Sequence, residues 1–212
     1  MNFPSKGLYA ITQTEHKSLD TVVNEVESAL KGGAVVVQYR DKQPQDAELL
    51  ASRLLKLCQQ YKVPLLINDD VDLAARIGAD GVHIGRDDGS IERARQRLGL
   101  QAIIGVSCYD SVDYALEAQS QGVNYVAFGR FFPSSSKPLA KPASLETLSL
   151  AKQELTIPIV AIGGILPENG SLLLKAGADV LAVIGGLFNE QPEQAAREYQ
   201  SLFERVKLKS AQ

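Results

Sequence analysis

A glycine followed by a strand-like apolar run recurs four times along the chain. Each of these segments begins with glycine, passes through small or polar residues into a run of apolar residues, and ends in a polar residue or glycine. They are residues 33–40, 78–85, 122–129 and 177–185. Each follows an amphipathic stretch, which indicates a helix that ends at the glycine before a strand begins. Because the strands are almost continuously apolar, the pattern predicts a parallel sheet buried on both faces.

Further periodic segments complete an alternation of strands and helices. Four more strands are predicted over residues 7–12, 63–68, 102–107 and 157–163. Helices are predicted over residues 18–31, 44–60, 70–77, 90–99, 110–121, 144–154, 167–176 and 191–207. Ser18, Asp46 and Asp110 lie near predicted helix starts, and Pro167 suits the first position of a helix.

Eight alternations without a linker or a break in composition predict a single-domain (β/α)8 TIM barrel, a compact one, over residues 1–212. An open doubly wound sheet is the alternative. It usually needs fewer strands, and the glycine-rich dinucleotide fingerprint is absent from this sequence.

Composition narrows the function classes. The chain is 45% hydrophobic and 22% charged, with a net charge of -3, so no basic field would attract nucleic acid or an anionic membrane. Any phosphate binding must come from a few placed cations and backbone amides. Cys58 and Cys108 lie far apart and predict free thiols in a reduced, cytoplasmic protein. No signal-peptide pattern opens the chain, and its apolar runs are too short to span a bilayer.

The carboxyl ends of barrel strands are where active sites of this fold lie. Polar residues, glycines and one isoleucine stand at these positions: Gln38, Arg40 and Lys42; Asn68 and Asp69; Asp88; Ser107; Ser134, Ser136 and Lys137; Gly163 and Gly164; Ile184, Gly185 and Gly186. Taken singly, each has a plainer interpretation as a solvated loop charge, a helix N-cap or a tight turn. His83 lies within a strand, where a packed, hydrogen-bonded histidine is expected rather than a catalytic one.

The combination points to phosphate chemistry. Asn68, Asp69 and Asp88 offer the hard oxygen ligands that Mg²⁺ takes alongside substrate phosphates. Arginine and lysines on the same rim supply positive charge, and the glycine pairs stand where many barrels hold phosphate on backbone N–H groups. No nucleophile–base triad, zinc spacing or Schiff-base lysine is evident. The chemistry indicated is therefore electrostatic: binding a phosphorylated substrate and helping a diphosphate to leave.

Six segments in barrel-compatible order carry a family resemblance: residues 7–12, 37–42, 66–70 with 79–85, 104–107, 128–138 and 160–165. In these the chain resembles thiamine-phosphate synthase over nearly its whole length. The resemblance implies a Mg²⁺-dependent transferase that joins 4-amino-2-methyl-5-hydroxymethylpyrimidine diphosphate to 4-methyl-5-(2-phosphoethyl)thiazole, or its carboxylated form. Pyrophosphate would leave first in a dissociative substitution that yields thiamine phosphate. Such a reaction needs no protein nucleophile, which agrees with the missing triad.

The resemblance also implies roles for the rim residues. Asp69 and Asp88 would hold Mg²⁺ against the diphosphate. The diphosphate would be contacted by Arg40, Lys42, Asn68 and Lys137, with Gln38 and Ser107 on the pyrimidine side. Catalysis is expected to rest on Arg40, Lys42, Lys137 and Ser107. The thiazole and its phosphate would be received by Ser134, Ser136 and the backbone of Gly164, Ile184 and Gly185.

The sequence departs from the family pattern at a few positions. Gly185 stands where the family commonly has serine, which keeps the backbone donor but loses a hydroxyl. Arg86 and Arg130 stand where the family often has uncharged residues; we expect them to pair with Asp87 at the surface rather than to contact phosphate.

The alternatives are a thiazole tautomerase-like enzyme, a regulatory barrel that binds thiazole phosphate, and a sugar-phosphate isomerase or epimerase. The first generally lacks the metal-binding aspartates, and the last needs an acid/base pair or metal-binding histidines. Retention of both Asp69 and Asp88 favours the synthase. The expected partners are small phosphorylated molecules, with neither nucleic acid nor membrane, and the oligomeric state is left open.

Overall fold

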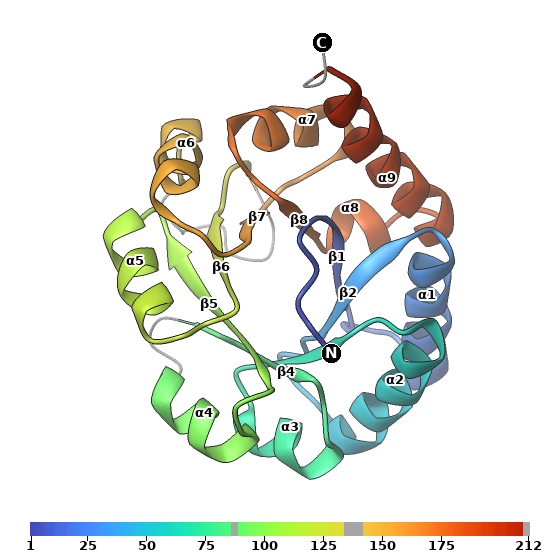
Figure 1. Ribbon diagram of the computed structural model, residues 1–212. Helices are drawn as coiled ribbons and strands as arrows, with labels where there is room; N and C mark the ends of the chain where they lie inside the picture. The colour runs from blue at the N-terminus through green and yellow to red at the C-terminus, as the bar shows by residue number, and fades with distance from the viewer. Residues whose placement is uncertain (86–88, 134–141, 210–212) are drawn as a thin grey trace.

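Eight parallel strands close into a barrel in chain order. The computed structural model describes residues 1–85, 89–133 and 142–209, with side chains described as far as Val206. β1 pairs with β2 on one side and with β8 on the other, so the sheet has no free edge. The helices form a ring around it (Figure 1). The predicted (β/α)8 barrel is confirmed.

The strands are β1 (Gly7–Ile11), β2 (Ala34–Tyr39), β3 (Leu65–Asn68), β4 (Gly81–Ile84), β5 (Ile103–Tyr109), β6 (Tyr125–Gly129), β7 (Ile159–Ile162) and β8 (Val180–Val183). The helices are α1 (Leu19–Lys31), α2 (Ala47–Tyr61), α3 (Val71–Ile77), α4 (Ile91–Leu98), α5 (Val112–Ser120), α6 (Leu145–Glu154), α7 (Pro167–Ala176), α8 (Gly185–Phe188) and α9 (Pro192–Lys209). The predicted elements are all present. The four-residue α8 was not predicted, because a glycine pair carries no helical periodicity.

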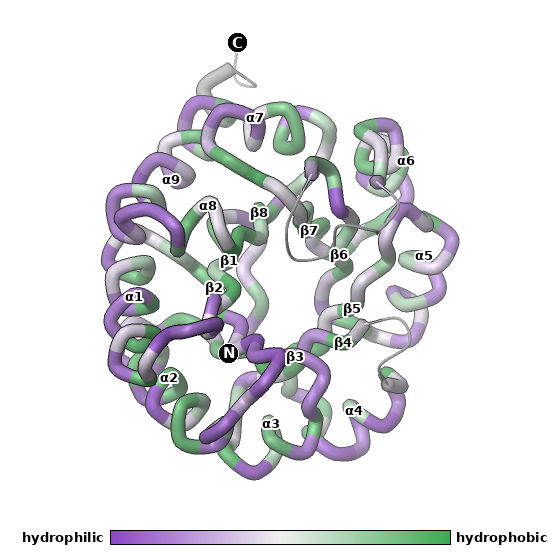
Figure 2. Tube along the Cα trace, turned by 180° about the vertical axis from the view of Figure 1, so that it is seen from behind, coloured by the Kyte–Doolittle hydropathy of each residue, from purple (hydrophilic) through white to green (hydrophobic). Residues whose placement is uncertain are grey.

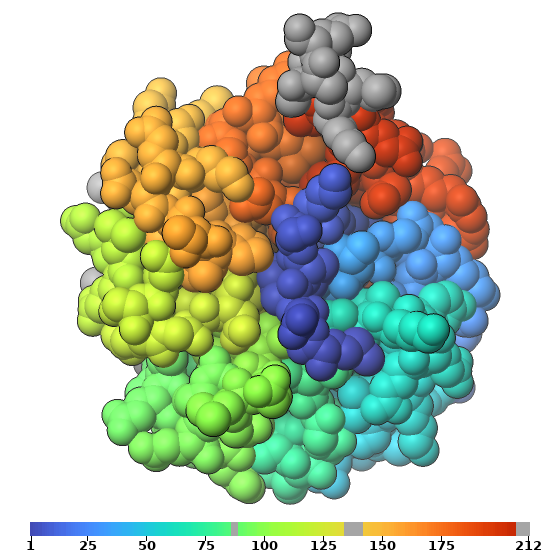
Figure 3. Space-filling view, viewed as in Figure 1, coloured from blue at the N-terminus to red at the C-terminus, as the bar shows by residue number. Residues whose placement is uncertain are grey.

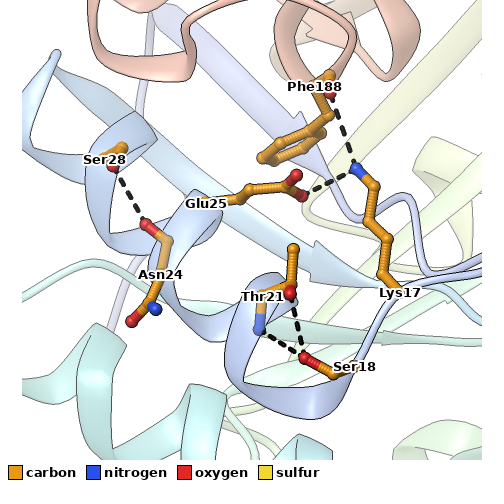
Figure 4. A network of polar contacts seen from close by, with 7 residues as sticks. All are labelled: Lys17, Ser18, Thr21, Asn24, Glu25, Ser28 and Phe188. Carbon is orange, nitrogen blue, oxygen red and sulfur yellow. Dashed lines mark hydrogen bonds and ion pairs between the residues drawn. The ribbon is translucent and has the colours of Figure 1, made fainter.

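Helix caps follow the sequence signals with one correction. Ser18 is the N-cap of α1, where its side chain accepts a hydrogen bond from the Thr21 N–H (Figure 4). Pro167 begins α7, as predicted. Asp110 does not cap α5; Ser111 does, since its hydroxyl accepts from the Tyr114 N–H.

The predicted glycine stops are confirmed at two of the four helix ends. Gly78 and Gly177 are the C-caps of α3 and α7. At the other two ends Gly32 and Gln121 are the C-caps, and the predicted glycine follows with a positive φ. In each case glycine supplies the left-handed backbone that turns the chain toward the next strand.

Two apolar layers stabilise the barrel. The larger lies between the strands and the helix ring, and the smaller fills the barrel interior with side chains that include Tyr9, Val36, Leu66, Tyr125 and Val180. Figure 2 shows green apolar stretches along the strands and largely purple loops in front of them. Both cysteines lie buried and are not joined in a disulfide, as expected. No helix in the described part of the chain is long and apolar enough to cross a membrane.

The N-terminal segment covers one end of the barrel. It runs across the middle of the face seen in Figures 1 and 3, ahead of β1. The Phe3 ring stacks on the Tyr125 ring with their centroids 3.9 Å apart, and it meets the Tyr9 ring edge-on at 6.1 Å. Since aromatic rings close this end, a cavity can open only at the carboxyl ends of the strands.

Gly81 provides a test of the barrel packing. A Cβ at Gly81 would lie 1.8 Å from the Ile103 carbonyl oxygen, on the neighbouring strand backbone that cannot move aside. Gly81→Ala should therefore lower the free energy of unfolding by about 3 kcal/mol or more. Gly78→Ala is the matched control: its Cβ would meet nothing within 4 Å, and its φ of +71° predicts a loss of only about 1 kcal/mol. Urea titration of both variants measures the difference, and equal losses would contradict the packing argument.

Candidate active site

A cavity of about 360 Å³ opens at the carboxyl ends of the strands. Residues from all eight strands or the loops that follow them line it. The cavity therefore lies where the fold predicts an active site.

Most of the predicted site residues within the described chain meet at this cavity. Its lining includes Gln38, Arg40, Asn68, Asp69, Ser107, Gly164, Ile184 and Gly185. Asp88, Ser134, Ser136 and Lys137 lie outside the described residues, as do Arg86 and Asp87.

Lys42 lies beside this cavity rather than in its lining. It lines a neighbouring hollow between the loops after β1 and β2, where its ammonium nitrogen is 3.8 Å from a carboxylate oxygen of Glu15. The alternation that placed Gln38, Arg40 and Lys42 on one side holds only while the chain is extended, and β2 ends at Tyr39. The structure thus brings Gln38 and Arg40 together and leaves Lys42 apart.

Asp69 is held at the cavity rim by its backbone and its neighbours. Its φ of +60° is left-handed, a conformation that aspartate tolerates better than most residues. The Asp69 N–H donates to the His83 carbonyl at 2.8 Å, and Oδ1 accepts from the Gly85 N–H at 3.0 Å. The Asn68 side-chain amide donates to Oδ2. These contacts orient the carboxylate between the ends of β3 and β4.

The donor set at this rim fits Mg²⁺ held largely by a substrate. Mg²⁺ is commonly bound through one or two carboxylates together with substrate phosphates and water. Asp69 supplies one such carboxylate, and the described residues contain no group of three His, Cys, Asp or Glu residues that could hold a metal. Asp70, next in the chain, has a structural role instead, because its side chain caps α3 by accepting from the Leu73 N–H at 2.7 Å.

Arg40 leaves β2 on a backbone fixed by Thr12. The buried Thr12 hydroxyl accepts from the Arg40 N–H at 2.8 Å and donates to the Arg40 carbonyl at 2.9 Å. These two hydrogen bonds join β1 to β2 at the rim and fix the backbone from which the Arg40 side chain extends. Arg130 is half-buried and lines the cavity after β6, while Asp87, its expected partner, lies outside the described residues.

A chain of hydrogen-bonded side chains extends from the cavity into the barrel interior. The Gln38 amide donates to the Tyr9 hydroxyl at 2.7 Å, and the two tyrosine hydroxyls lie 2.9 Å apart. The Tyr125 hydroxyl is 2.9 Å from His83 Nδ1, and His83 Nε2 is 2.9 Å from the Ser107 hydroxyl. His83 is thus hydrogen-bonded and nearly buried, as predicted, although it also touches the cavity.

Tyr9 and Tyr125 were not among the site residues predicted from the sequence. Both lie in otherwise apolar strands, and both are essentially inaccessible to solvent. Burial raises the pKa of each phenol, so both stay protonated. A tyrosine in a fully buried strand was the available signal, because a buried hydroxyl needs a partner.

The glycines after β7 and β8 differ in what they require. Gly164 has a φ of +64°, and a Cβ there would lie 2.4 Å from the Pro133 carbonyl oxygen, so only glycine fits. Gly185 has no such backbone constraint. A Cβ at Gly185 would meet only the end of the Asn189 side chain, with its amide nitrogen 2.9 Å away. Asn189 itself lines the cavity.

The α8 segment is held from behind by Lys17. The Lys17 ammonium donates to Glu25 on α1 at 2.8 Å and to the Phe188 carbonyl at 3.5 Å (Figure 4). On the α9 side, the Tyr199 hydroxyl donates to the Ile165 carbonyl at 2.9 Å. Both loops at this side of the cavity are thereby tied to the helix ring.

The chain is similar in sequence and in fold to known members of one family. The thiamine monophosphate synthase family matches residues 8–187. The chain is 50% identical to the thiamine-phosphate synthase of Methylococcus capsulatus, over 95% of this chain and 91% of that protein. It is 51% identical to the thiamine-phosphate synthase of Marinobacter nauticus, over 94% and 91% of the two chains. The solved structure of thiamine phosphate pyrophosphorylase from Pyrococcus furiosus superposes with a TM-score of 0.86 at 35% identity, covering 95% and 97%.

The resemblance inferred from six short segments thus extends over nearly the whole chain, in sequence and in fold. This protein belongs to the thiamine monophosphate synthase family.

Proposed function

We propose that this protein is a thiamine-phosphate synthase, a transferase that joins 4-amino-2-methyl-5-hydroxymethylpyrimidine diphosphate to 4-methyl-5-(2-phosphoethyl)thiazole, or its carboxylated form, and releases pyrophosphate. The observation that carries the proposal is the meeting of Arg40, Asn68 and Asp69 at one rim of a cavity, in a member of this family. Cation, amide and carboxylate at one rim suit a diphosphate with its metal ion.

The diphosphate side of the cavity lies over β2, β3 and β4. Arg40 is suited to clamp diphosphate oxygens because a guanidinium can donate two parallel hydrogen bonds. Asp69, together with Asp88, would hold Mg²⁺, which supplies charge neutralisation to the departing diphosphate. Lys42 and Lys137 would add positive charge at the rim, Lys42 after a rotation of its side chain away from Glu15. Such preorganised charge favours departure of the leaving group.

The second substrate would sit on the β7 and β8 side. Gly164, Ile184 and Gly185 line the cavity there, with Ser134 and Ser136 proposed as the hydroxyl donors to the thiazole phosphate. The Asn189 amide lies beside Gly185, in the space that a serine side chain would use. Asn189 can therefore supply the donor that the serine-to-glycine change removes.

The remaining residues would orient the organic parts and exclude water. Apolar side chains such as Ile11, Val160 and Ile162 line the cavity beneath the rim. A pyrimidinylmethyl cation formed as the diphosphate leaves must be captured by the thiazole nitrogen before water reaches it. A preformed apolar cavity favours that outcome.

The runner-up is a tautomerase-like or regulatory barrel that binds thiazole phosphate alone. Such a protein has no need of a carboxylate that accepts hydrogen bonds from two neighbours on the diphosphate side. The hydrogen bonds to Asp69 therefore favour the synthase. A cytoplasmic location is part of the proposal, since it supplies the reducing conditions that free thiols suit.

Release of pyrophosphate tests the activity directly. The purified protein should release pyrophosphate only when both substrates and Mg²⁺ are present. Mg²⁺ would neutralise the departing diphosphate, and the thiazole would capture the pyrimidinylmethyl cation. A coupled phosphate assay with each component omitted in turn measures this. Turnover of thiazole phosphate alone would instead support the tautomerase-like alternative.

Asp69→Asn tests the metal assignment. The amide keeps the size of the side chain but loses its charge, so turnover should fall by about 100-fold or more. The Mg²⁺ concentration needed for half-maximal rate should rise. Asp70→Asn is the control: asparagine also caps helices, and activity should remain close to that of the parent. Equal losses in both variants would contradict the assignment.

Asn189→Ala tests the second subsite. Loss of one donor should raise the KM for thiazole phosphate about fivefold to tenfold and leave the KM for the pyrimidine diphosphate unchanged. Asn24→Ala, at an exposed position on α1, serves as the matched control. A rise in the KM for the pyrimidine substrate would place Asn189 on the wrong side of the cavity.

A further inference from the structure

The hydrogen-bonded chain of side chains beneath the cavity consists largely of buried polar residues. Gln38, Tyr9 and Tyr125 are 2%, 1% and 0% exposed, and His83 is 9% exposed. Four of its members line the cavity, but Tyr125 does not. The Tyr125 hydroxyl nevertheless sits at the middle of the chain, between Tyr9 and His83.

One direction of the hydrogen bonds uses every hydroxyl proton inside the network. The Gln38 amide nitrogen donates to the Tyr9 oxygen. When Tyr9 in turn donates its proton to Tyr125, the Tyr125 proton is directed to His83 Nδ1, which accepts it as the unprotonated ring nitrogen. In this order a neutral His83 carries its proton on Nε2 and donates to the Ser107 oxygen.

This order determines what the two ends of the chain present to a ligand. The Ser107 oxygen accepts from His83, so its own proton is available to donate into the cavity. One of the two Gln38 amide protons is donated to Tyr9, and the Gln38 carbonyl oxygen remains as an acceptor. A donor and an acceptor on two sides of the cavity suit an aminopyrimidine, which carries ring nitrogen acceptors and an exocyclic amine donor.

The Tyr125 ring is clamped from two directions. Phe3, from the N-terminal segment, stacks against it with an interplanar angle of 12°. Gly105 on β5 lies so close that a Cβ there would be 1.9 Å from Tyr125 Cζ. The glycine leaves the space through which the phenol crosses the barrel interior. The hydroxyl therefore occupies a position fixed by packing, and not one that substrate must induce.

We propose that Tyr125 is a positioning residue that orders the protons of this chain, holding His83 as its Nε2–H tautomer, Ser107 as a donor and Gln38 as an acceptor toward the pyrimidine. The identity of the ligand rests on the proposed function. The order of the protons does not, because it is a property of the protein without substrate.

Nitrogen NMR on the ligand-free protein tests the proton order. The protein has two histidines, His16 and His83, and a His16→Asn variant identifies the resonances of His83. With ¹⁵N-labelled histidine, long-range ¹H–¹⁵N correlations should show His83 protonated at Nε2 and its Nδ1 shifted upfield by an accepted hydrogen bond. Protonation at Nδ1 would overturn the proposal.

Tyr125→Phe tests the residue itself. The Nδ1 resonance of His83 should move downfield to the position of an acceptor without a donor. In steady-state assays, the KM for the pyrimidine diphosphate should rise about tenfold, with the KM for thiazole phosphate unchanged. Equal changes in both KM values, or an unmoved Nδ1 resonance, would overturn the positioning role.

Two further variants separate this role from a general loss of stability. Tyr61→Phe removes a phenol hydroxyl that donates to Glu27 on the outer ring, and should change neither the resonance nor the kinetics. Gly105→Ala should displace the Tyr125 phenol and reproduce the Nδ1 shift of Tyr125→Phe. If the parent protein releases no pyrophosphate, the proposed function fails, while the NMR spectra still decide the proton order.

Discussion

Closure of the parallel sheet is the constraint on which the rest of this molecule depends. With β1 paired to both β2 and β8, all eight strands point the same way around one axis. Their carboxyl ends must then share one rim, and Arg40 and Gly185 come to line the same cavity although about two thirds of the chain separates them. A single open edge would remove this convergence. Packing of Phe3 at the other end reinforces it.

Closure also creates a demand inside the barrel. Polar side chains that point inward are cut off from water, so each must find a partner among its neighbours. The chain from Gln38 to Ser107 meets that demand and ends at the cavity on both sides. The interior thus sets the hydrogen-bonding character of the cavity floor. Packing and the proposed recognition of the pyrimidine are parts of one network.

The two sides of the cavity are supported differently. On the proposed diphosphate side, hydrogen bonds hold the functional groups directly: Thr12 fixes the Arg40 backbone, and the Gly85 N–H orients Asp69. On the opposite side, Lys17 joins the Phe188 carbonyl of α8 to Glu25 on α1 (Figure 4). The Tyr199 hydroxyl of α9 donates to the Ile165 carbonyl after β7. The glycines in the loops after β7 and β8 have no side chains to anchor the backbone, so side chains from other segments have to hold it in place.

The sequence by itself determined the alternation of strands and helices, the barrel, and the rim on which Arg40 and Asp69 lie, since these follow from local periodicity and from the direction of parallel strands. Six short segments in the expected order also indicated the family. Only the tertiary structure decided that Lys42 leaves the cavity for Glu15, that Arg130 enters it, and that Tyr125 joins Tyr9 to His83. The reason is physical: Tyr9 and Tyr125 are 116 positions apart, and no local pattern records which buried hydroxyls the closed barrel brings within hydrogen-bonding distance.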